Sequence, residues 1–170
     1  FLRMHNVDLP WGLSCHYHGG IAAPEHDGYA EDMDYKGQYF KTLIQPGSYW
    51  DYVYPNDQPM ATNWYHDHCI HHTAENVYRG TAGFYLQRDD VETQLNLPGN
   101  KLTDDPQYEI AMVFQDKIFD SNGDFVYDHN GQAGDVGDVQ LVNGVPWPVM
   151  EVKARKYRFR WLNGSTWRRY

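Results

Sequence analysis

Two short histidine motifs place the tightest limit on how this chain can fold. The stretches 15–19 (CHYHG) and 64–68 (WYHDH) each carry two histidines separated by one residue. Residues i and i+2 of a β-strand project from the same face, so each stretch can direct two imidazoles to one side. If the two stretches are neighbouring strands, all four imidazoles meet at one point. The motifs therefore predict a sheet that pairs two distant segments.

The four histidines form a candidate metal site. Imidazole is a suitable ligand for copper, zinc, iron and nickel, so His16, His18, His66 and His68 are the candidate ligands. One His-x-His motif alone is weak evidence, but two in similar aromatic contexts strengthen the hypothesis. Asp67 lies between two candidate ligands and should point to the opposite face, which favours a structural role for its carboxylate.

The rest of the chain predicts an all-β protein. Aromatic residues make up 16% of the sequence, and such residues favour strands. Short runs of alternating or aromatic residues recur between turn signals, a pattern typical of a β-sandwich or Greek-key barrel. Asn143-Gly144 is the dipeptide of a type I′ hairpin turn. A short helix is expected at 71–78, and strands are expected at 1–9, 13–18, 48–54, 62–68, 81–87, 108–114, 139–142 and 155–162.

Net charge and hydropathy argue against nucleic-acid binding and against a membrane-spanning helix. The net charge of −9 disfavours nucleic-acid binding, which needs a basic surface. The chain has no run of 18 apolar residues, so no membrane-spanning helix is expected. The two cysteines, Cys15 and Cys69, each adjoin a histidine motif. They could form a disulfide or could be two small buried hydrophobic residues.

The chain divides into three predicted regions. Residues 1–88 and 108–170 carry the strand patterns, and residues 89–107 read as an interdomain linker rich in Asp, Asn, Pro and Gly. The first residues already read as a strand, and the last ones end without a closing turn. We therefore expect a piece of a longer chain.

Several motifs together resemble the multicopper oxidases. The resemblance rests first on residues 16–19 (HYHG), 64–68 (WYHDH) and 78–85 (YRGTAGFY). Closer markers point to the branch of bilirubin oxidases and spore-coat laccases, with the fungal bilirubin oxidases nearest. These markers are residues 27–32, 73–76, 142–148 and 155–160. The resemblance covers most of the chain in the family's own order.

The resemblance implies a fold and a chemistry. The fold would be cupredoxin-like Greek-key β-barrels in a multi-domain oxidase, with the later part of the first domain at 1–88 and the beginning of the second at 108–170. The activity would be oxidation of phenolic or bilin-type donors, with four-electron reduction of O2 to water at a trinuclear copper cluster. A secreted enzyme is expected, with O2, a small-molecule donor and the remainder of the enzyme as partners.

Site residues follow from the same resemblance. His16 resembles the type 2 copper ligand, and His18, His66 and His68 resemble ligands of the type 3 copper pair. Asp27 corresponds to a catalytic acid that supplies protons to the oxygen being reduced. The type 1 copper site, which accepts electrons from the donor, would lie outside this chain.

Two other readings remain open. The chain could be a non-catalytic copper- or zinc-binding β-domain that uses the same four histidines, or a structural β-sandwich whose histidines are incidental. Tyr17 and Trp64 are expected to be core residues and not redox relays. His71 and His72 are disfavoured as ligands, because a helix would turn them away from the cluster.

Overall fold

A computed structural model describes residues 1–29, 43–100, 104–129 and 136–170. It divides into two compact units. Unit 1 comprises residues 1–59 and 63–85, and unit 2 comprises residues 60–62 and 86–170. The predicted division into 1–88, 89–107 and 108–170 remains a prediction. None of the helices in the described part of the chain combines the length and hydropathy that crossing a bilayer requires.

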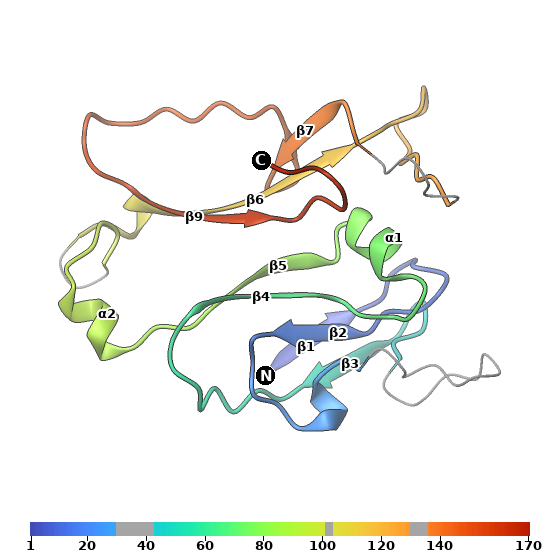
Figure 1. Ribbon diagram of the computed structural model, residues 1–170, viewed down its shortest axis with the longest axis horizontal. Coiled ribbons are helices and arrows are strands. Elements are labelled where there is room, and N and C mark those ends of the chain that lie inside the picture. The colour runs from blue at the N-terminus through green and yellow to red at the C-terminus, as the bar shows by residue number, and fades with distance from the viewer. Residues whose placement is uncertain (30–42, 101–103, 130–135) are drawn as a thin grey trace. The chain divides into compact units, whose positions relative to one another are not determined.

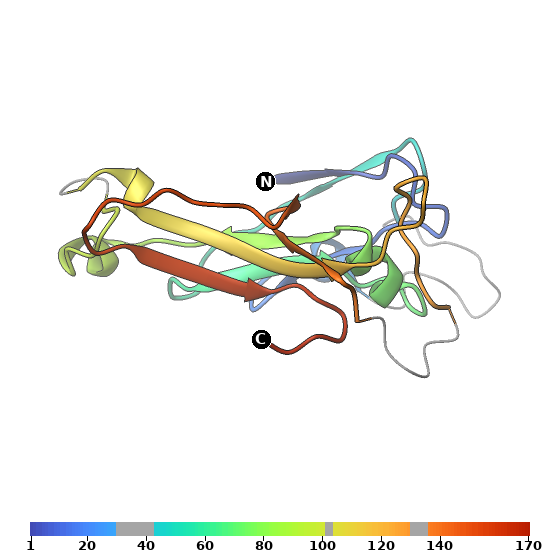
Figure 2. The same cartoon turned by 90° about the horizontal axis from the view of Figure 1, so that it is seen from above.

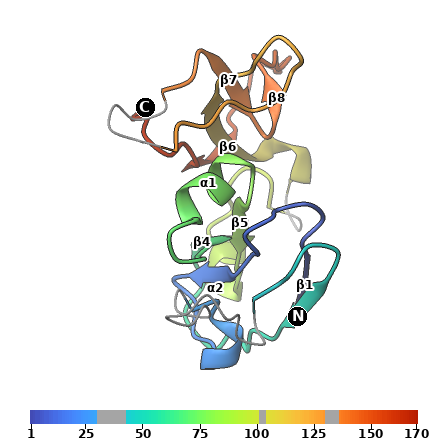
Figure 3. The ribbon, with the colours of Figure 1, turned by 90° about the vertical axis from the view of Figure 1, so that its right-hand side faces the viewer.

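Unit 1 contains two small sheets (Figure 1). The first pairs two antiparallel strands, and the second has the strand order β2-β4-β5. Helix α1 lies on the chain between β4 and β5, at one end of this sheet (Figures 1 and 3). The elements are β1 (Leu2–His5), β2 (Cys15–His18), η1 (Pro24–His26), β3 (Tyr49–Tyr52), β4 (Thr62–Asp67), α1 (Thr73–Tyr78) and β5 (Ala82–Leu86).

The core of unit 1 explains why β2 forms where it does. Cys15 and Tyr17 are 1% and 0% exposed, whereas His16 and His18 on the other face are partly or fully exposed. The period of two is that of a strand with one buried face. The buried face packs in a cluster of mostly aromatic and aliphatic side chains, which consists of Leu9, Leu13, Cys15, Tyr17, Ile44, Tyr52 and Tyr54.

Unit 2 contains a sheet with the strand order β8-β7-β6-β9. Its long strands β6 and β9 are parallel to each other (Figure 2), and β8 pairs with β7 (Figure 3). The elements are α2 (Asp90–Gln94), η2 (Pro106–Tyr108), β6 (Glu109–Lys117), β7 (Val139–Val142), β8 (Val145–Pro146) and β9 (Arg158–Asn163).

The all-β prediction is confirmed, and local contacts explain where element ends differ. The strand predicted at 1–9 stops at His5, because the buried Asn6 side chain binds the backbone of Leu9 and Ile44 and turns the chain. The helix predicted from residue 71 starts at Thr73, because His71 adopts a left-handed φ of 64°.

The turn predicted at Asn143-Gly144 is present, and a helix that was not predicted, α2, lies within the predicted linker. Asn143 and Gly144 have φ of 51° and 79°, as a type I′ turn requires. Within the predicted linker, α2 forms because the Asp89 side chain caps it by accepting a hydrogen bond from the Glu92 amide at 2.8 Å.

Candidate metal centre

Strands β2 and β4 place the predicted histidines on one face. The two strands are antiparallel, with His16 opposite His66 and His18 opposite Trp64. His68 follows β4 and continues the ladder, because its amide donates to the carbonyl of Ser14 at 2.7 Å. Directly paired residues of antiparallel strands share a face, so the histidines of both motifs project to the same side.

The four imidazole rings lie together. The ring centroid of His16 is 5.7 Å from that of His18, 5.5 Å from that of His66 and 5.0 Å from that of His68. One ring nitrogen from each of His16, His18 and His66 lies within 4.8 Å of the others. Such spacing places several nitrogen donors where metal ions could bind.

Backbone carbonyls fix the protons on two of the rings. The Nδ1 atom of His16 lies 2.7 Å from the carbonyl oxygen of Asp27, and the Nδ1 atom of His66 lies 2.7 Å from that of Asp67. A carbonyl oxygen only accepts hydrogen bonds, so each Nδ1 is the donor. In the neutral ring Nε2 then carries a lone pair, the form that binds metals.

The other two rings have nitrogens that suit a metal ion. The Nδ1 atom of His18 faces the Nε2 atom of His66 at 3.3 Å. The Nδ1 atom of His68 is buried and has no hydrogen-bond partner among the described residues. Burial, and secondarily the neighbouring imidazoles, lower the pKa of His66, which favours its neutral form. An all-imidazole donor set of this kind fits copper.

Asp27 approaches the cluster through its backbone as well as its side chain. Its carboxylate oxygen Oδ1 lies 3.3 Å from Nδ1 of His16, in addition to the carbonyl contact. The sequence motif pointed to the carboxylate, but nothing in a side-chain pattern could reveal the carbonyl contact. Gly28 follows with φ of 64°, and a Cβ atom there would lie 2.1 Å from the carbonyl oxygen of Cys15.

Asp67 is buried on the face opposite the histidines. Its residue is 1% exposed, and its two carboxylate oxygens accept hydrogen bonds from the amides of Ser14 and Cys69 at 3.0 and 2.9 Å. Burial raises the pKa of Asp67 to about 6, against these hydrogen bonds. Its contacts support the structural role predicted for this side chain.

The two cysteines are free and buried. Of the two alternatives considered, the structure shows the small buried side chains and not the disulfide. Burial raises the pKa of the Cys15 thiol to about 12, so the thiol is protonated near neutral pH.

The neighbouring rings differ in their surroundings. Tyr17 is fully buried in the core, as predicted. Trp64 is only partly buried, and its ring stacks on His18 with centroids 5.1 Å apart. His72 stacks on Trp11 at 4.7 Å.

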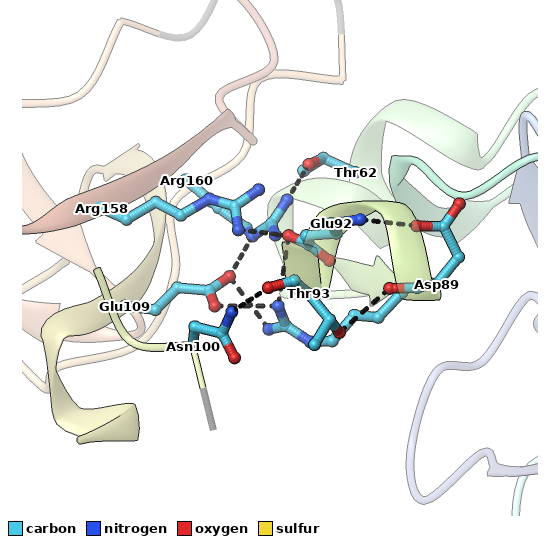
Figure 4. A network of polar contacts seen from close by, with 9 residues as sticks. Thr62, Asp89, Glu92, Thr93, Asn100, Glu109, Arg158 and Arg160 are labelled. Atoms are coloured by element: carbon cyan, nitrogen blue, oxygen red, sulfur yellow. Dashed lines mark hydrogen bonds and ion pairs between the residues drawn. The ribbon is translucent and has the colours of Figure 1, made fainter. Parts of the chain in front are cut away.

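A second polar cluster lies in unit 2 (Figure 4). Its acids are Glu92 on α2 and Glu109 on β6, and its bases are Arg88, Arg158 and Arg160. The Glu109 carboxylate accepts two hydrogen bonds from Arg88 at 2.8 and 2.9 Å. Arg160 lies within the strand predicted at 155–162, and its side chain is 5% exposed and binds both acids. In the sequence, only the i, i+4 spacing of Arg88 and Glu92 could have indicated an ion pair in this cluster.

Comparison with known proteins identifies the family. A family model described as multicopper oxidase matches residues 2–91, more than half of the chain. The chain belongs to the multicopper oxidase family. Its resemblance to that family, inferred from the histidine motifs, is confirmed.

Individual multicopper oxidases match nearly the whole chain. The bilirubin oxidase of Albifimbria verrucaria is 41% identical over 98% of this chain, which spans 26% of that protein. The 2F4 variant of the multicopper oxidase McoA from Aquifex aeolicus superposes with a TM-score of 0.72 at 31% identity, over 96% of this chain and 33% of that one. The expected cupredoxin-like fold is confirmed by such structures.

A relative that is named for a different role also matches. The cell division protein FtsP of Escherichia coli is 40% identical over 75% of this chain and 26% of its own length. The chain therefore spans about a quarter to a third of the proteins it matches. Membership of the multicopper oxidases implies that copper ions are the cofactor.

Proposed function

We propose that this chain supplies half of the histidine ligands of a trinuclear copper cluster in an oxidase. The carrying observation is the convergence of four imidazoles from β2 and the end of β4, with two tautomers fixed by backbone carbonyls. His16 would hold the type 2 copper, and His18, His66 and His68 would bind the type 3 pair. Bound copper supplies one-electron steps that carry electrons from a donor to O2.

The chain's own residues would orient ligands and supply protons. Reduction of one O2 to two waters takes four electrons and four protons, and the electrons would come from a phenolic or bilin-type donor. Asp27 is proposed to deliver protons, because its carboxylate lies beside the His16 ring at 3.3 Å and is accessible to solvent. The carbonyls of Asp27 and Asp67 bind Nδ1 of their imidazoles, which leaves the Nε2 lone pair of each ring as the donor to a metal ion.

Other parts of the cluster are proposed to come from further polypeptide. Relatives extend well beyond the share that this chain matches. The remaining histidine pairs and the type 1 copper site would be provided there, in a secreted protein. Fractionation of the source cells tests the proposed location. We expect to find the protein in the medium.

The test measures copper and oxygen in the complete protein that carries residues 1–170. We expect copper to survive dialysis in stoichiometric amounts, and O2 to be consumed with a diphenol or with bilirubin. His16→Ala and His66→Ala should each lower the copper content. The proposal fails if the wild-type protein loses all copper on dialysis, or if both variants keep the full amount.

A second candidate is a non-catalytic copper- or zinc-binding domain. The observation that favours it is the match to FtsP, which is named for cell division and not for an oxidase activity. This candidate predicts bound metal without O2 consumption, and no strong visible absorption from a copper–thiolate centre. Oxygen uptake that depends on copper excludes it.

A further inference from the structure

Asp67 makes a hydrogen bond with every polar group that it has. Its amide donates to the carbonyl of Thr81 at 3.0 Å, and its carbonyl accepts from Nδ1 of His66 at 2.7 Å. Its carboxylate oxygens accept from the amides of Ser14 and Cys69 at 3.0 and 2.9 Å. One buried residue thus joins the start of β2, the end of β4 and the segment before β5.

Asn76 on α1 completes this arrangement. Its residue is 0% exposed, and its side-chain amide donates to the carbonyl of Gly12 at 3.0 Å. Its backbone accepts from the amide of Thr81 at 3.1 Å. The helix therefore supports the loop that enters β2 and, through Thr81, the backbone of Asp67.

These contacts lie directly behind the histidines. Ser14 precedes His16 by two residues, and its carbonyl also accepts from the amide of His68 at 2.7 Å. The carboxylate of Asp67 therefore closes the ladder beyond the last paired residues of β2 and β4. A change there shifts the strands against each other at the point where the imidazoles must converge.

We propose that Asp67 and Asn76 are positioning residues for the copper-binding histidines. The inference rests on the proposed function, because it assigns residues that hold the proposed ligands in place. A carboxylate is required because both of its oxygens accept from backbone amides. Asparagine at position 67 would replace one acceptor with an NH2 donor, which would face an amide donor.

The test measures Cu(II) binding by the complete protein and its Asp67→Asn variant. We expect the variant to bind Cu(II) about 10- to 100-fold more weakly, as is typical when a partner that orients metal ligands is changed. The electron paramagnetic resonance spectrum of the bound Cu(II) should also change, which a loss of stability alone would not cause. Asn76→Ala should shift affinity and spectrum in the same direction.

A matched control is Glu75→Gln. Glu75 is also buried on α1, but its carboxylate pairs within the helix with Arg79 at 2.9 Å. This variant should keep the Cu(II) affinity and spectrum of the wild type. If Asp67→Asn does not fold, Asn76→Ala decides the question.

The outcomes separate this inference from the proposed function. Wild-type protein that binds no Cu(II) overturns the proposed function and the inference together. Wild-type binding with unchanged affinity and spectrum in whichever of the Asp67 and Asn76 variants fold overturns only the positioning role. Equal losses in Glu75→Gln and Asp67→Asn would also refute it, because general destabilisation would then explain both.

Discussion

Two of the proposed ligand residues, His16 and His66, owe their chemical state to backbone carbonyls. The carbonyl of Asp27 serves one ring and that of Asp67 serves the other, each at 2.7 Å. A substitution that changes only the side chain at these positions leaves the carbonyl in place. The side-chain role of Asp27 can therefore be separated from its backbone role.

Asp27→Asn should slow O2 reduction while copper stays bound. A positioned acid typically contributes about 10²- to 10⁴-fold to a rate, so we expect a loss of turnover in that range. Oxygen-electrode assays and copper analysis of the same samples check this. A variant with wild-type turnover would remove Asp27 from the proton path, and a variant without copper would assign it to metal binding.

Lys117 is a buried residue whose charge costs stability. Burial lowers the pKa of Lys117 from 10.5 to about 8. Below pH 8 the lysine is charged in both the folded and unfolded states, and the cost is fully present. Between pH 8 and 10.5 the lysine is neutral in the folded state but still protonated in the unfolded state. The free energy of unfolding should therefore rise with pH in this range.

Lys117→Met should therefore stabilise the protein at pH 7 by about 3 kcal/mol, an order-of-magnitude figure from the size of the shift. The advantage over wild type should shrink as the pH rises from 8 to 10. Urea unfolding at several pH values measures it. An advantage that does not vary with pH would show that packing, and not charge, separates the two proteins.

Elements of unit 2 are joined by buried charge. The side chains of Arg160, Glu92 and Glu109 are 5%, 7% and 7% exposed, and they link β9 to α2 and β6. Removing one member of a buried ionic group is far more costly than removing an exposed pair, because the remaining charges stay out of water. The network should thus contribute to holding these elements in register.

Arg160→Met should destabilise the protein by about 3 kcal/mol, the lower part of the range for a broken buried pair, because Arg88 still binds Glu109. Arg3→Met, which removes an exposed pair with Asp51, serves as the control and should change little. Thermal unfolding compares the two. Similar midpoints for both variants would mean that the network adds no net stability.

The sequence predicted elements better than their ends and better than long-range charge pairing. The His-x-His motifs predicted the pairing of β2 and β4 because a period of two is local and visible. The positive φ of His71 and the turn made by Asn6 depend on tertiary contacts, so no local sequence pattern predicts them. The contacts of Arg160 with Glu92 and Glu109 join distant residues, so periodicity alone could not pair them.

At the scale of the whole molecule, the candidate ligands all lie in unit 1. A ligand stabilises the states that contain its intact site. If the two units open separately, copper should protect one of them and leave the other unchanged.

Hydrogen exchange with and without Cu(II) tests this expectation. Amides of β2 and β4 should exchange more slowly with copper, by up to about 2.7 kcal/mol of added protection at a free concentration 100 times the dissociation constant. Amides of β6 and β9 should not change. Equal protection of both sets would show that the two units open together.

The absence of a Cβ atom at Gly28 lets the 27–28 segment pack closely against β2, beside His16. Alanine there would bring its methyl group 2.1 Å from the Cys15 carbonyl oxygen and push the 27–28 segment away from β2. The His16 ring would then lose its partner and be free to rotate. Gly28→Ala, which adds no charge and no polar atom, should therefore weaken Cu(II) binding in a titration, whereas Gly47→Ala, where the new methyl group meets nothing within 4 Å, should not. One added carbon atom, far from any donor nitrogen in the covalent structure, would thus weaken the proposed metal site without changing a ligand.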